Sequence, residues 1–254
     1  MKFFALSSAA MTAMLLLCSC SDRDSADKKL NQAVKQARQG EWESVQKSAS
    51  DLAVDYPKTS APLLLQALAY EKSGDMFKAI DLATQCAKAD PENFTVLYTL
   101  GRLYSQDAQR SAEAFTILEH ALELKPDDRN TLILLCNLGV TRNEPNTGKY
   151  IDMLMKQSDR ESFARIGYLK ALFLGNNGKI SEAVNYMFEA AKSSRDNPLL
   201  ILNAARFIDR QGREYRIKAR NLYMIFVSIY QRTASPAPEL LQEAKIRIQK
   251  LAVR

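Results

Sequence analysis

Apolar residues recur at helical spacing toward the C-terminal end of the chain. Within residues 239–253 they fall on one face of a predicted helix: Leu240, Leu241, Ala244, Ile248 and Leu251. The preceding segment 222–230 is apolar on nearly every side and needs cover on both flanks. This pattern predicts that 239–253 is an amphipathic helix that covers the end of a helical core.

The composition extends this helical prediction to the whole chain. The 254 residues are 46% hydrophobic and 25% charged, which is close to the average of globular proteins. Nine glycines and eight prolines are few against the many good helix formers. We therefore expect an all-α protein that is long enough to bury a sizeable core.

Turn-forming residues recur at an interval of about 34 positions. Gly40 and Gly74 show this spacing, as do Pro57 and Pro91, and Pro126 follows one residue later than the interval requires. A fixed period of this length is typical of proteins built from one repeated unit of structure.

Two adjacent units, residues 60–93 and 94–128, resemble the tetratricopeptide repeat, a helix pair with large apolar, small, Tyr, Gly and Pro residues at set positions. The matching residues are Leu63, Ala67, Tyr70, Gly74, Ala79, Cys86 and Pro91, followed by Leu97, Leu100, Gly101, Tyr104, Ala114, Ala121 and Pro126. The resemblance extends more weakly to 26–59, 129–163, 164–197 and 198–234.

The resemblance implies a right-handed superhelix of about six helix pairs over residues 30–234, capped by the helix at 239–253. Small residues such as Ala67 and Ala79 are expected where the two helices of a pair cross closely. No pair can bury its apolar side alone, so the pairs stack and leave a concave inner surface.

In this family, partners contact the first helix of each pair at repeat positions 2, 5, 9, 12 and 13, which we call the first-helix face. Here these positions supply tyrosine, arginine and asparagine side chains that suit a peptide or carboxylate. The predicted partner-binding residues are Tyr98, Arg102, Asn137, Arg165, Tyr168, Arg206 and Arg210. An ordinary solvated helix face is the alternative.

The first nineteen residues are predicted to be a signal peptide, because Lys2 precedes an apolar stretch too short to span a bilayer. The sequence Leu17-Cys18-Ser19-Cys20 resembles a bacterial lipobox. That resemblance implies lipid attachment at Cys20, with acyl chains such as palmitate, whereas Cys18 fits the motif poorly. Residues 20–29 would then form a polar tether.

Charge is distributed unevenly along the chain. Residues 159–254 hold 17 Lys and Arg against 9 Asp and Glu, while the rest of the chain is close to neutral. The basic C-terminal part is predicted to meet an acidic protein, an anionic lipid or a cell-wall polymer, or to be a solvated face. Nucleic acid is not an expected partner of an exported protein.

Catalytic and metal chemistry find little support in the sequence. His120 is the one histidine, so no cluster of histidine ligands can form. The Gly175–Lys179 segment lacks the residues of a phosphate loop, and Ser44 with Lys47 lacks the partner motifs of an acylation site. We expect neither an enzyme nor a resident cofactor or metal.

Together these patterns predict a scaffold anchored by lipid in the bacterial envelope, at the outer rather than the inner membrane because Ser21 follows the modified cysteine, and facing the periplasm. It would bind a segment of another envelope protein and assist assembly of a pilus or of outer-membrane proteins. Two alternatives stay open: an adaptor that recruits cell-wall hydrolases to peptidoglycan, and a glycan-binding lipoprotein, for which the single Trp42 offers few stacking surfaces.

Overall fold

The computed structural model describes residues 20–56, 59–194, 196–233 and 237–252. Across these ranges the regular structure is helical throughout, with no strand. Within the described residues, six helix pairs and a final single helix follow one another, which confirms the predicted fold class. The predicted signal peptide, residues 1–19, lies outside the described residues, and the lipidation of Cys20 stays a prediction.

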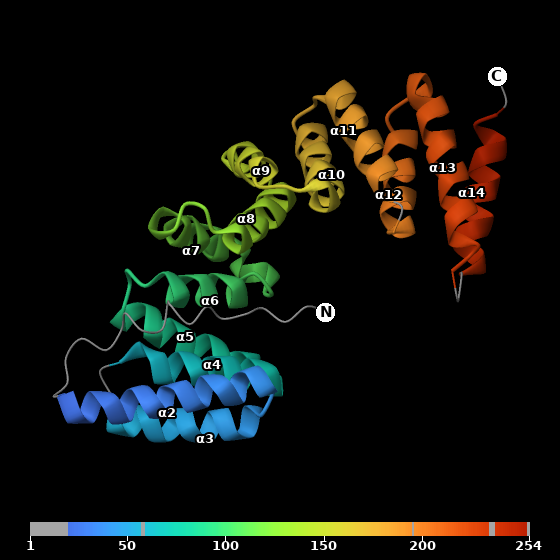
Figure 1. Ribbon diagram of the computed structural model, residues 1–254. Coiled ribbons are helices and arrows are strands. Elements are labelled where there is room, and N and C mark those ends of the chain that lie inside the picture. The colour runs from blue at the N-terminus through green and yellow to red at the C-terminus, as the bar shows by residue number, and fades with distance from the viewer. Residues whose placement is uncertain (1–19, 57–58, 195, 234–236, 253–254) are drawn as a thin grey trace. The chain divides into compact units, whose positions relative to one another are not determined.

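The chain divides into two compact units, residues 1–134 and 135–254 (Figure 1). The first unit contains α2 (Cys20–Gln39), α3 (Trp42–Asp55), α4 (Ser60–Ser73), α5 (Met76–Ala89), α6 (Phe94–Tyr104), the short 3-10 turn Ala108–Arg110 and α7 (Ser111–Leu124). The boundary falls within α8 (Arg129–Arg142). The second unit continues with α9 (Thr147–Lys156), α10 (Arg160–Asn176), α11 (Ile180–Ser193), α12 (Pro198–Asp209), the 3-10 turn Arg213–Tyr215, α13 (Arg216–Tyr230) and α14 (Pro238–Lys250).

The turn between α4 and α5 shows how the sequence ends one helix and starts the next. Gly74 adopts φ 88° and ψ 0°, a left-handed conformation that a residue with a side chain reaches only at a cost. The next residue, Asp75, accepts a hydrogen bond from the backbone N–H of Lys78 and so caps α5. Helix α5 ends at Ala89, two residues before Pro91.

The fourth repeat, residues 129–163, has no glycine at the corresponding place, and Asn143 takes the left-handed conformation there with φ 55°. Asparagine tolerates this conformation better than most residues because its short side chain forms local hydrogen bonds. The repeat therefore keeps its turn although its sequence signal is weak.

Close packing between α6 and α7 follows from the absence of a side chain at Gly101. A Cβ atom on Gly101 would lie 2.7 Å from Cγ of Leu118. Ala114, which also faces this contact, is fully buried. Small residues therefore mark the crossing of the two helices, as the repeat pattern predicted.

The core of the second unit is built around α13. Tyr223 and Phe226 are almost fully buried among α11, α12 and α14, and Ala244 is the residue of α14 that is completely covered. Met224, in contrast, is 47% exposed. Helix α13 thus has one open face and is covered less completely than its apolar sequence predicted.

The predicted tether at residues 20–29 is helical in the structure and belongs to α2. This segment contains no glycine or proline to stop a helix. Lys29 also donates to Asp55 at 2.7 Å, which ties the end of this segment to α3.

Candidate functional site on the first helices

In the first unit, Arg102 is held by a carboxylate of the preceding repeat. Its Nη1 and Nη2 atoms donate to Oε1 and Oε2 of Glu71 at 2.5 and 2.7 Å, and Gln106 adds a hydrogen bond at 3.3 Å. The side chains of Glu71 and Arg102 are only 12% and 24% exposed. This two-point contact links α4 to α6 and leaves the predicted binding residue Arg102 already paired.

The buried carboxyl of Glu71 remains ionised because of these donors. Burial alone would raise the pKa of Glu71, but the hydrogen bonds and positive charge of Arg102, with a smaller contribution from Gln106, lower it below its ordinary value. The pair therefore joins two repeats as long as the carboxyl is charged.

Tyr98 is the remaining predicted residue of the first unit. It lies one turn before Arg102 on α6, is half-buried, and stacks on Phe94 with ring centroids 6.0 Å apart. Burial raises the pKa of its hydroxyl, which has no hydrogen-bond partner among the described residues. Tyr98 thus offers a partly exposed aromatic ring and a free hydroxyl.

The second unit contains the other five predicted residues. Asn137 on α8 and Tyr168 on α10 are half-buried, and burial raises the pKa of the Tyr168 hydroxyl. Arg165, one turn before Tyr168, is exposed and has no ion-pair partner among the described residues. The side chains on α10 are therefore open to a partner.

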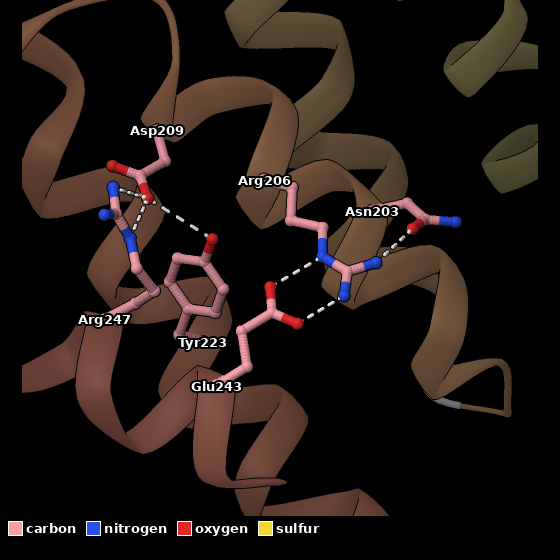
Figure 2. A network of polar contacts seen from close by, with 6 residues as sticks. All are labelled: Asn203, Arg206, Asp209, Tyr223, Glu243 and Arg247. Carbon is pink, nitrogen blue, oxygen red and sulfur yellow. Dashed lines mark hydrogen bonds and ion pairs between the residues drawn. The ribbon is translucent and has the colours of Figure 1, made fainter. Parts of the chain in front are cut away.

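The last two predicted residues are Arg206, which lies on α12, and Arg210, which directly follows that helix. Arg206 belongs to a polar network between α12 and α14 (Figure 2). Arg206 grips Glu243 of α14 at two points, and its Nε lies 2.8 Å from Oε1. This hydrogen bonding lowers the pKa of the Glu243 carboxyl and raises that of the Arg206 guanidinium.

A second ion pair in the network joins the same two helices. Arg247 of α14 donates through Nε to Oδ2 of Asp209 at 2.6 Å, and the hydroxyl of Tyr223 contacts the same oxygen at 3.3 Å. Burial, followed by the nearby charge of Asp209, raises the pKa of Tyr223 to about 12. The Asp209 side chain is 6% exposed, so the network is anchored below the surface.

These side chains surround a cavity of about 360 Å³. Its walls are formed by Arg206, Asp209, Arg210, Tyr223, Glu243 and Arg247. Arg210 is exposed and has no hydrogen-bond or ion-pair partner among the described residues. The structure thus brings two predicted residues to one cavity together with four groups outside the predicted set: Asp209, Tyr223, Glu243 and Arg247.

The two buried thiols, the single histidine and the glycine-containing segment before α11 occupy ordinary structural positions. Cys86 and Cys136 are free and fully buried, and burial raises the pKa of each thiol to about 12. Nε2 of His120 lies 3.4 Å from Oε1 of Glu92. Residues 177–179 form the turn between α10 and α11. In the described part of the chain no three candidate metal ligands gather, and no helix is long and apolar enough to cross a membrane.

Comparison with known proteins agrees with this architecture. A model of the tetratricopeptide repeat matches residues 94–128, which is the repeat with close helix packing at Gly101. Solved structures extend the likeness to most of the chain. The chain has the tetratricopeptide-repeat fold. No curated protein sequence matches it.

Three of these solved structures align with this chain over nearly their whole length. The structure titled "Functional Characterization of Pseudomonas Aeruginosa pilF" has a TM-score of 0.63 and 16% identity, and covers 88% of this chain and 97% of its own. PilW, titled a widely conserved type IV pilus biogenesis factor, has a TM-score of 0.63 and 15% identity, and covers 87% and 98%. YrrB, titled "a TPR protein with an unusual peptide-binding site", has a TM-score of 0.61 and 16% identity, and covers 78% and 97%.

Proposed function

We propose that this protein is a lipid-anchored, non-enzymatic scaffold of the bacterial envelope that binds a segment of another envelope protein on its first-helix face. In this role it assists the assembly of an envelope complex such as a pilus or a set of outer-membrane proteins. The tetratricopeptide-repeat fold supports the binding of a protein partner. The fold shared with two pilus-biogenesis structures is consistent with the assembly role.

The observation that carries the binding proposal is that several side chains of the first-helix face are accessible and have no partner within the described part of the protein. Tyr98 and Tyr168 are half-buried aromatic rings, while Arg165 and Arg210 are exposed and unpaired among the described residues. Tyrosine and arginine contribute a large share of the binding energy in protein interfaces. A peptide segment lying on either unit would meet such an anchor.

Capture of the partner tests this proposal. The full-length protein, tagged at its C-terminus and solubilised from membranes, is expected to co-purify with its partner, and the Tyr98→Ala/Tyr168→Ala double variant is expected to lose most of it. The matched control is Phe77→Ala/Ile217→Ala, which removes two exposed apolar side chains from the second helices α5 and α13. Equal recovery with both double variants would contradict binding on the first-helix face.

The membrane anchor needs its own experiment. Labelling with an alkyne fatty acid is expected to mark the wild-type protein and the Cys18→Ser variant but not the Cys20→Ser variant. Two or more acyl chains hold a protein to a bilayer durably. Labelling of the Cys20→Ser variant would contradict the proposed attachment site, and release of the wild-type protein by a salt wash would contradict the anchor.

A peptidoglycan adaptor is the second candidate, favoured by basic residues around the start of α13. The basic residues follow one another at short intervals in the sequence, and Arg213 is exposed: Arg213, Arg216, Lys218 and Arg220. Sedimentation with purified sacculi that weakens as salt rises would support this candidate. The glycan-binding alternative has less support, because Trp42 is half-buried and the ammonium group of Lys72 lies over its ring, where a sugar would stack.

A further inference from the structure

The cavity between α12 and α14 contains more hydrogen-bond donors than acceptors. Three arginines line it, while its carboxylates are Asp209 and Glu243. Each guanidinium carries five N–H groups and accepts nothing. The wall therefore has an excess of one positive charge.

The acceptors of the cavity are already engaged. Both carboxylate oxygens of Glu243 are used by Arg206. Oδ2 of Asp209 receives Arg247 and Tyr223 together. Both carboxylates of the cavity are therefore already engaged in contacts between α12 and its neighbours α13 and α14.

Several donors are left over after these pairs form. Arg206 directs Nη1 only to Oδ1 of Asn203, at a long 3.4 Å. The guanidinium of Arg210 has no hydrogen-bond partner among the described residues, and Arg210 directly follows α12, one helical turn beyond Arg206. An acceptor-rich anion is the kind of group that would satisfy them.

The size of the cavity narrows the class of anion. The cavity of about 360 Å³ is at the small end of the range for ligand sites, roughly 300–1,000 Å³. It has room for one or two side chains, which favours a peptide segment over a nucleotide-sized cofactor.

We propose that this cavity binds a carboxylate of the partner segment, with Arg210 as its main contact. The inference rests on the proposed function and names the chemistry of its partner. Glu243 holds Arg206 as such a carboxylate would, so the incoming group competes with a carboxylate of the protein's own α14.

Direct binding of synthetic peptides tests this assignment. Fluorescein-labelled glycine-serine peptides with a central Leu-Glu-Glu-Leu and an amidated C-terminus are titrated with the full-length protein in detergent. A second peptide carries Leu-Gln-Gln-Leu with an amide end, and a third carries Leu-Gln-Gln-Leu with a free C-terminal carboxylate. Binding of the first peptide alone would assign the site to acidic side chains, and binding of the third to a chain terminus.

Three variants make the test specific. Arg210→Gln is expected to weaken the acidic peptide about tenfold, the loss of a charge-assisted contact. Glu243→Gln is expected to tighten it about threefold, because Arg206 becomes available while the glutamine keeps the shape. Arg213→Gln, an exposed arginine outside the cavity with the same change in net charge, is expected to stay within about twofold of wild type at physiological salt.

The proposal is overturned if both carboxylate-bearing peptides fail to bind at about 1 mM, an affinity of about 4 kcal/mol. It is also overturned if the all-amide glutamine peptide binds as well as they do, or if Arg210→Gln and Arg213→Gln have equal effects. A partner that is captured through Tyr98 and Tyr168 but ignores Arg210 would leave the scaffold function standing and remove only this site.

Discussion

Two arginines at the same repeat position, Arg102 and Arg206, each grip one glutamate at two points, but in different surroundings. In the first unit the carboxylate comes from the preceding repeat, and its side chain is 12% exposed. In the second unit it comes from the final helix α14, and the side chain of Glu243 is 36% exposed. One contact is a buried joint between repeats, and the other is the wall of an open cavity.

The difference shows that the repeat position of an arginine on the first-helix face does not by itself determine its role. Burial and neighbouring acceptors decide whether its donors are used up. Arg102 meets Glu71, which Gln106 also contacts, within a packed interface. Arg206 has Arg210 one turn away, so positive charge there exceeds what α14 neutralises. We therefore assign stability to the first pair and recognition to the second site.

The largest expected effect comes from breaking the buried pair. Arg102→Ala leaves the carboxylate of Glu71 buried, with Gln106 as its remaining hydrogen-bond partner among the described residues, and should lower the free energy of unfolding by about 3 kcal/mol. Urea unfolding followed by circular dichroism measures the change. The double variant Arg102→Ala/Glu71→Ala should recover part of the loss, because no unpaired charge remains. A single variant as stable as wild type would contradict a structural role for the pair.

A smaller loss is expected where α14 is fixed to α12. Arg247→Ala removes the cation that faces Asp209, whose side chain is 6% exposed, but leaves the hydroxyl of Tyr223 near the carboxylate. We expect about 2 kcal/mol of destabilisation. Arg206→Ala, whose partner is more exposed, should cost about 1 kcal/mol or less. The reverse order in urea unfolding would show that the contact with Glu243 is the stronger attachment of α14.

Acid separates the two glutamate pairs further. The pKa of Glu71 is lower in the folded protein than its ordinary 4.5, so the carboxyl contributes stability that is complete above that value and is lost as pH falls through the folded pKa. Glu71→Gln should therefore lower stability at pH 7 and flatten its decline below pH 4.5. Glu243→Gln should do the same more weakly because its side chain is more exposed. Unfolding curves at a series of pH values measure both slopes.

Much of the fold could be predicted from sequence because its determinants are local and periodic. Gly74, Ala114 and Pro91 sit at repeat positions where backbone geometry or close packing admits few residue types. The helical extension of residues 20–29 was missed, since a polar segment with no glycine or proline suits a helix as well as a tether. The cover of α13 was overestimated because the apolar pattern does not reveal that Met224 faces outward.

The candidate site could be predicted only in part. The repeat register placed Arg206 and Arg210 on one face of a predicted first helix, and it also placed Glu71 and Arg102 on neighbouring first helices. It gave no means to predict Glu243 and Arg247, because α14 lies beyond the last repeat and its register depends on the connection that precedes it. Whether an arginine is paired depends on such contacts, which repeat position alone does not specify.

The most direct test measures stability and peptide affinity on the same two variants, Arg102→Gln and Arg210→Gln. Arg102→Gln is expected to lower the free energy of unfolding by at least about 2 kcal/mol, while the folded variant binds the Leu-Glu-Glu-Leu peptide with nearly wild-type affinity. Arg210→Gln is expected to leave stability within about 0.5 kcal/mol of wild type and to weaken the peptide about tenfold. Loss of stability without loss of affinity in Arg210→Gln, or the reverse in Arg102→Gln, would contradict the division between joint and binding site.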